Sequence, residues 1–208
     1  MAGLGDVAEL RDMPAPDHVA LREQRIEFAG PIFTIRNDQI EFESGDLAWR
    51  QYMDHHDAVA VVAMRSGAES ASGEPEVLLI RQYRHASRRI FWEIPAGLRD
   101  ISGEDGLLTA QRELAEEADM QAADWRYLVS FYASPGCSNE NLDIYLATGV
   151  TPVTESSLGA DFEREDEERE IVTAWWPLSQ VRAAVRRGDL RSPTLVLGVL
   201  AAYDELNK

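Results

Sequence analysis

Three glutamates lie close together in the stretch TAQRELAEEADM, which spans residues 109–120. Their positions, Glu113, Glu116 and Glu117, are three and four residues apart, so in a helix all three carboxylates project from nearly the same face. Like charges at this spacing repel one another by roughly a few tenths of a kcal/mol per pair. Hard divalent cations bind clustered carboxylate oxygens, and a bound cation would relieve the repulsion. The spacing therefore indicates a divalent-cation site.

The same glutamates have a simpler explanation as a solvated helix face. Glutamate favours the helix, and acidic runs usually face water. Arg112 also precedes Glu116 by four residues, the ordinary spacing of a helical ion pair. On the helix alone the solvated face is the more common case, so the cation site needs support from the surrounding sequence.

The glutamates are expected on an amphipathic helix that follows a loop. One side of residues 107–118 consists of Leu107, Leu108, Gln111, Leu114, Ala115 and Ala118. The loop before it contains Ala96 and Gly97, whose carbonyl groups would complete a shell of cation ligands.

Short apolar or alternating runs on both sides of this helix predict the strands of a sheet. They are residues 32–42, 47–53, 57–64, 76–84, 125–133, 141–150 and 171–178. Two further helices are expected at residues 178–188 and 192–207. This mixture of strands and helices predicts an α/β or α+β domain.

The composition narrows the partners and the compartment. The chain has 20 Lys+Arg against 37 Asp+Glu, a net charge of −17 that repels phosphate backbones, so we expect no nucleic-acid partner. The single cysteine, Cys137, excludes an intrachain disulfide and fits a reducing compartment. No run approaches the roughly 18 apolar residues of a membrane span, and the first residues lack a signal-peptide pattern. We therefore expect a cytoplasmic protein with no membrane partner.

The order of residues from Gly97 to Asp119 resembles the Nudix box, the Mg²⁺-binding loop–helix–loop of Nudix hydrolases. The family pattern is Gly, five residues, Glu, seven residues, then Arg-Glu-apolar-x-Glu-Glu-x-Gly-apolar. In this chain Gly97 is followed by six residues, Glu104, seven residues and RELAEEADM. The match from Glu104 to Glu117 is complete. Such a block is hard to obtain by chance, so the resemblance favours the cation site over the solvated face.

Two positions depart from the family pattern. One extra residue separates Gly97 from Glu104, a glutamate that in the family more often acts indirectly or through water. Asp119 stands where the family has the glycine that ends the helix, with positive φ. Aspartate tolerates that conformation better than most residues, so a helix that ends normally requires Asp119 to be left-handed. Neither departure removes a carboxylate, so metal binding should survive.

The segments beside the box are similar to the ADP-ribose pyrophosphatase branch of the family. LLIRQYRHASRRIFWEIPAGL before the box and SPGCSNENLDIYLATG after it carry this resemblance, which covers roughly residues 30–205. It implies a Nudix fold, in which a mixed β-sheet is sandwiched between helices, with an N-terminal antiparallel strand pair before it. We assign residues 1–56 to an N-terminal arm and strand pair, for dimerisation and the substrate pocket, and residues 57–208 to the Nudix hydrolase domain. The branch also implies a homodimer.

The resemblance implies roles for the residues of the box. Glu113 and Glu117 are the main metal ligands, supported by Glu116 and the carbonyl of Ala96. Arg112 orients the glutamates through salt bridges, because a guanidinium can bridge two carboxylates. The metal is expected to be Mg²⁺, with Mn²⁺ as an alternative.

The family also uses a glutamate from a late loop as the base that activates water. Here that loop is EREDEEREIVTAWWPL, and its alignment on the following strand favours Glu168, then Glu167, with Glu170 as a third candidate. A carboxylate beside metals and other carboxylates has a perturbed pKa, which suits a base. The alternative is a solvated acidic loop.

Four residues outside the box are candidates for substrate binding. Arg84 follows a buried strand and would bind the pyrophosphate, the alternative being a structural ion pair. Ser138 and Glu140 would contact the terminal ribose, or they form a plain turn. Trp49 is a weaker candidate for the adenine pocket, since tryptophans more often pack in cores or interfaces.

The predicted function is Mg²⁺-dependent hydrolysis of the pyrophosphate of ADP-ribose to AMP and ribose 5-phosphate. The first alternative is hydrolysis of another nucleoside diphosphate sugar or of a dinucleoside polyphosphate. The second is a non-catalytic Nudix-like sensor of ADP-ribose, which the complete set of box carboxylates disfavours.

Overall fold

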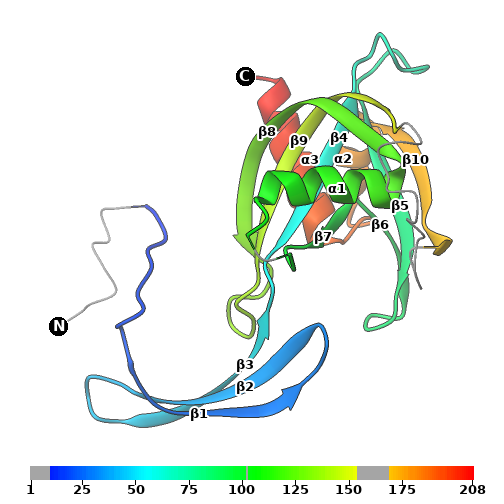
Figure 1. Ribbon diagram of the computed structural model, residues 1–208. Coiled ribbons are helices and arrows are strands. Elements are labelled where there is room, and N and C mark those ends of the chain that lie inside the picture. Colours follow the sequence, from blue (N-terminus) through cyan, green and yellow to red (C-terminus); the bar gives the residue numbers. More distant parts are fainter. Residues whose placement is uncertain (1–9, 102, 154–168) are drawn as a thin grey trace. The chain divides into compact units, whose positions relative to one another are not determined.

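The computed structural model describes residues 10–101, 103–153 and 169–208. The chain divides into two compact units. The first is Met1–His55 with Ser134–Glu140, and the second is His56–Ala133 with Asn141–Lys208. Figure 1 shows the three-stranded sheet of the first unit and the larger sheet with its helices in the second.

The first unit contains an antiparallel sheet of three strands in the order β1-β2-β3. These strands are Ala20–Ala29, Phe33–Glu41 and Leu47–His55. The N-terminal strand pair expected from the sequence is confirmed as β2 and β3, whose partners run from Phe33 opposite His55 to Glu41 opposite Leu47. The additional strand β1 was not predicted, because its apolar alternation is confined to Ile26 and Phe28 and every residue of the strand is exposed.

A loop from a distant part of the chain completes this unit at strand β3. The N–H of Met53 donates to the carbonyl of Cys137 at 2.8 Å, and the N–H of Asn139 donates to the carbonyl of Met53 at 3.3 Å. The side-chain oxygen of Asn139 also accepts the N–H of His55 at 2.9 Å. Residues 134–140 thus bind along β3 as an extra edge segment.

The second unit is built on a mixed sheet. Its main path is β10-β5-β4-β9-β8, with β6 paired to β5 and β7 paired to β4. The strands are β4 (Ala58–Arg65), β5 (Glu76–Arg84), β6 (Arg89–Glu93), β7 (Ala96–Leu98), β8 (Met120–Tyr132), β9 (Asn141–Pro152) and β10 (Val172–Pro177). Strands β4 and β9 are parallel and the other pairs are antiparallel, which confirms the mixed sheet.

Helices cover both faces of this sheet, as the sequence predicted. They are α1 (Gly106–Ala118), α2 (Leu178–Arg187) and α3 (Pro193–Leu206). Alternate residues of β4 point to opposite faces. Val61 packs in one core cluster with Leu114 of α1, whereas Val62 packs in the other with Val199 of α3. None of the helices in the described part of the chain is long and apolar enough to cross a membrane.

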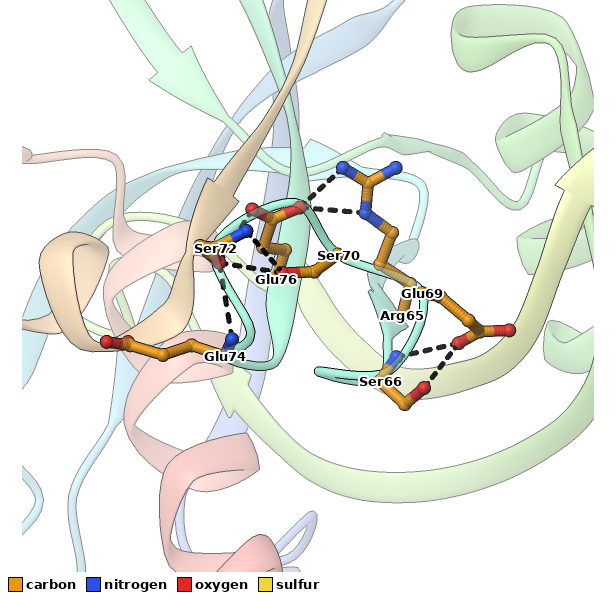
Figure 2. A network of polar contacts seen from close by, with 7 residues as sticks. All are labelled: Arg65, Ser66, Glu69, Ser70, Ser72, Glu74 and Glu76. Atoms are coloured by element: carbon orange, nitrogen blue, oxygen red, sulfur yellow. Dashed lines mark hydrogen bonds and ion pairs between the residues drawn. The ribbon is translucent and has the colours of Figure 1, made fainter.

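The connection between β4 and β5 is held by its own polar side chains (Figure 2). The guanidinium of Arg65 donates to the buried carboxylate of Glu76 at 2.7 Å, and the hydroxyl of Ser72 donates to the same carboxylate at 3.0 Å. Helix α2 begins on this connection, because the N–H of Leu178 donates to the carbonyl of Pro75 at 2.9 Å. The hydroxyl of Ser179 donates to Glu74 at 2.5 Å. The turn therefore fixes the start of α2.

Substitution of two leucines of α1 tests how much the packing of this helix on the sheet contributes to stability. Leu114 is fully buried against the sheet and Leu108 is 55% exposed. We expect Leu114→Ala to lower the free energy of unfolding by about 2–5 kcal/mol, since it leaves a cavity in the core. The matched control Leu108→Ala should change it by about 0.5 kcal/mol or less. Urea unfolding measures both, and equal losses would contradict this packing.

Candidate active site

The ends of α1 set the position of its glutamates. At the start, the side chain of Asp105 accepts the N–H of Leu107 at 2.8 Å and caps the helix. At the end, Asp119 has φ 54° and ψ 34°, the left-handed conformation, and its N–H donates to the carbonyl of Ala115 at 3.0 Å. The expected left-handed conformation of Asp119 is therefore confirmed. The helix ends here as it would with the glycine of the family pattern, although the residue is an aspartate.

Two of the three glutamates are buried rather than solvated. Glu113 is 7% exposed and Glu117 is 6% exposed. The carboxylate of Glu117 accepts the backbone N–H of Ala96 in β7 at 2.8 Å. A β-carbon built on Gly97 would lie 2.1 Å from the carboxylate carbon of Glu113, so only glycine leaves room for this side chain. The carboxylates therefore lie against the backbone of β7, and the explanation as a solvated face is wrong for these two residues.

Arg112 joins the acidic side chains of the site. Its Nη1 lies 2.8 Å from Glu113 and 2.9 Å from Glu116, and its Nη2 lies 3.5 Å from Glu104. Burial lowers the pKa of the Arg112 guanidinium, but the three carboxylates outweigh it, so its pKa is raised above the ordinary value. The side chain stays charged and holds the carboxylates in fixed positions.

Glu104 links the loop before α1 to the helix itself. Its carboxylate accepts the hydroxyl of Thr109, a fully buried residue of α1, at 2.8 Å, in addition to the contact with Arg112. Sequence reasoning missed Thr109. Its polar side chain on a largely apolar helix face, five residues after Glu104, was the available signal.

Arg84 forms an ion pair in this structure. Its Nη2 lies 2.7 Å from the carboxylate of Glu93, a buried residue that also accepts the side-chain amide of Gln82 at 3.1 Å. The alternative of a structural ion pair is thus present, and the Arg84 side chain is still 44% exposed. Glu93 was missed from the sequence, where a lone acid in the apolar run RIFWEIP was the signal.

The other predicted substrate residues belong to the first unit. Ser138 is buried, and its hydroxyl accepts the N–H of Glu140 at 3.2 Å, so the expected turn is present. The carboxylate of Glu140 lies 3.7 Å from Nδ1 of His55. The guanidinium of Arg25 lies 4.3 Å from the ring centre of Trp49. The structure thus joins Ser138 and Glu140 in one turn, while Trp49 lies on β3.

The predicted base falls largely outside the described residues. Glu167 and Glu168 lie there, and only Glu170, an exposed residue, is described. Across residues 10–101, 103–153 and 169–208, no three acidic, histidine or cysteine side chains converge as a ready-made metal site. Glu113 and Glu117 are instead engaged by Arg112 and by the N–H of Ala96. Their oxygen donors beside the peptide groups of β7 nevertheless suit a hard divalent cation.

Comparison with known proteins identifies the class. Residues 54–195 match the family model of the NUDIX domain, so the chain belongs to the Nudix family. It is a Nudix hydrolase, an enzyme that acts on a diphosphate, as the sequence predicted. Enzymes of this family generally use divalent metal ions.

Particular relatives confirm the resemblance to one branch. The chain is 37% identical over 174 residues to the ADP-ribose pyrophosphatase of Mycobacterium tuberculosis, covering 84% of this chain and 78% of that protein. It is 30% identical over 145 residues to the ADP-ribose pyrophosphatase of Bacillus subtilis, covering 70% of each. A crystal structure of an ADP compounds hydrolase matches with a TM-score of 0.72 at 19% identity, covering 94% of this chain and 97% of that one, and shows the same fold.

Substitution of Gly97 tests the close approach of Glu113. In Gly97→Ala the new methyl group displaces the end of the flexible Glu113 side chain, so the fold should remain while the carboxylate moves. We expect diphosphate hydrolysis to fall about 100-fold, the cost of a displacement of roughly 1 Å in an active site. Steady-state kinetics and thermal unfolding measure the two effects. Unchanged kcat/KM in a folded Gly97→Ala protein would contradict the geometry.

Asp119 allows a separate test of the helix end. Both Asp119→Gly and Asp119→Ala remove the side chain, but only glycine adopts φ 54° without strain. We expect the glycine variant to exceed the alanine variant in unfolding free energy by about 1 kcal/mol. Chemical denaturation measures the difference, and an equal or more stable alanine variant would show that the left-handed conformation is not required.

Proposed function

We propose that this enzyme hydrolyses the pyrophosphate of ADP-ribose to AMP and ribose 5-phosphate, with Mg²⁺ as its metal. The observation that carries the proposal is the burial of Glu113 and Glu117 against β7 within a Nudix helix. The two relatives named as ADP-ribose pyrophosphatases support the choice of substrate. The similarity of the flanking segments to that branch supports it as well.

The residues that would hold Mg²⁺ are those that α1 and β7 bring together. Glu113, Glu116 and Glu117 would supply carboxylate oxygens and Ala96 its carbonyl oxygen. When bound, the ion supplies charge neutralisation at the pyrophosphate and acidification of a water molecule. Arg112 keeps the carboxylates oriented, since its guanidinium contacts Glu113 and Glu116 within 2.9 Å.

The remaining steps are assigned to side chains outside α1. Glu168, with Glu167 as the alternative, would take the proton of the attacking water. Arg84 would contact the pyrophosphate oxygens. To do so, its partly exposed guanidinium would exchange the carboxylate of Glu93 for the pyrophosphate. Ser138 and Glu140 would contact the terminal ribose.

We also propose the wider setting of the enzyme. It would act as a cytoplasmic homodimer, with residues 1–56 as the dimerisation region and residues 57–208 as the hydrolase domain. The single cysteine supports the reducing compartment. Trp49, with an exposed fraction of 37%, would contribute to the adenine pocket.

A substrate panel tests the reaction. With Mg²⁺, we expect ADP-ribose to give AMP and ribose 5-phosphate with a higher kcat/KM than another nucleoside diphosphate sugar or a dinucleoside polyphosphate. Absence of AMP in a folded sample would refute the proposed substrate. Binding of ADP-ribose in a calorimeter without turnover would identify a sensor instead.

Variants of the glutamates test the metal site in the same assay. Glu113→Gln and Glu117→Gln should each lower kcat by at least about 100-fold, because each removes charge needed for the metal. The control Asp204→Asn, on exposed α3 surface, should retain activity. Mg²⁺ should raise the Tm of the native chain and not that of the two glutamine variants. Full activity in either glutamine variant would overturn the assignment.

A further inference from the structure

A cavity of about 320 Å³ lies between the sheet and helix α2 in the second unit. Its walls include Leu79, Trp92, Trp176, Val181, Ala184 and Arg187. Leu79 and Val181 belong to the core cluster on the α2 and α3 face, whereas Leu114 of α1 belongs to the cluster on the opposite face. The cavity therefore lies on the other side of the sheet from the glutamates of α1, and none of the predicted site residues within the described part of the chain lines it.

Two tryptophans give this pocket aromatic walls. Trp92 of β6 and Trp176 of β10 meet edge to face, with ring centres 6.2 Å apart and planes at 76°. Trp176 is 40% exposed, so part of its indole surface is open to a ligand. Indole edges and faces bind flat rings through offset stacking and edge-to-face contacts. Walls of this kind suit a planar aromatic group.

Among the residues that line the pocket, Arg187 carries a positive charge, although the whole chain carries −17. Arg187 lines the pocket, and Arg81 lies with its guanidinium 5.5 Å from the ring centre of Trp92. Arg187 pairs with Asp189 at 2.8 Å, but both side chains are more than half exposed. Exposed ion pairs of this kind are weak, so Arg187 can exchange Asp189 for a ligand anion. Arg187 thus offers a positive charge to a ligand anion at this pocket.

The wall formed by α2 is fixed in advance. The start of α2 is bonded to the β4–β5 connection through Leu178 and Ser179, and that connection is itself held by Arg65 and Glu76 (Figure 2). A pocket with a fixed wall loses little conformational entropy when it binds. Ligand pockets typically have volumes of about 300–1,000 Å³, so this one suits a small molecule.

We propose that this pocket binds a small planar aromatic anion, a class that includes mononucleotides and aromatic carboxylates or sulfonates. The ring would lie against Trp92 and Trp176, and the anionic group would contact Arg187. This binding is separate from the proposed hydrolysis, because the pocket and the glutamates lie on opposite faces of the sheet.

Titration of the full chain with 1-anilinonaphthalene-8-sulfonate tests the proposal. The measured quantity is the fluorescence of the dye, excited in the dye's own absorption band rather than through the tryptophans. We expect one dye per chain. Arg187→Gln should weaken binding by about tenfold, as expected for loss of a charged hydrogen bond, while the matched control Arg186→Gln, outside the pocket, should bind like the native chain. Ala184→Phe, which narrows the pocket, should abolish binding, while Leu197→Phe on partly exposed α3 surface should not.

Competition then identifies the source of the anion. Displacement of the dye by AMP but not by adenosine would assign the pocket to mononucleotides, and displacement by naphthalene-2-sulfonate alone would assign it to aromatic acids. No dye binding to the native chain, or equal binding by the native chain and a folded Ala184→Phe variant, would overturn the proposal. Since the dye titration does not depend on hydrolysis, its failure is distinct from failure of the ADP-ribose assay.

Discussion

The burial of two carboxylates against the backbone of β7 is the constraint on which the site depends. An unpaired carboxylate in the interior costs several kcal/mol, roughly, so Glu113 and Glu117 can be buried only where partners meet them. The N–H of Ala96 and the guanidinium of Arg112 are those partners. Helix α1 can therefore dock in one position along β7, and the missing side chain at Gly97 sets how close it comes.

Most of the fold could be predicted because its signals are local. The alternation in β4 places successive residues in two cores, and Leu114 and Ala118 of α1 pack in one of them as predicted. Leu108, placed on the same apolar side, is exposed, so the buried face of α1 was predicted only in part. Strand β1 could not be predicted in this way, since it is held by cross-strand contacts such as Asn37 to Glu27 at 2.8 Å rather than by burial. Such contacts join polar side chains on neighbouring strands and leave no apolar pattern in the sequence.

The site, like the fold, could be predicted from the sequence only where the signal is local. The spacing of the glutamates on one helix is a local property, and it was sufficient to predict a shared face. Burial, by contrast, depends on what packs against the helix, so the helix spacing alone could not separate a solvated face from a buried one, and the choice rested on the family resemblance. Two other contacts became visible only in three dimensions. They are the ion pair of Arg84 with Glu93 across the β5–β6 hairpin and the hydrogen bond between Thr109 and Glu104.

The loop Ser134–Glu140 makes the small N-terminal unit discontinuous in sequence. His55 and Asn139, whose hydrogen bond helps to complete it, are 84 residues apart. During synthesis the three strands emerge before Ser134–Glu140, which leaves the ribosome only after α1 and β8. Until then the edge of β3 lacks the segment that pairs with it. Closing so long a loop is slow compared with forming a hairpin. The three-stranded sheet is thus synthesised before the segment that completes it, and the nascent chain exposes an open strand edge in the interval.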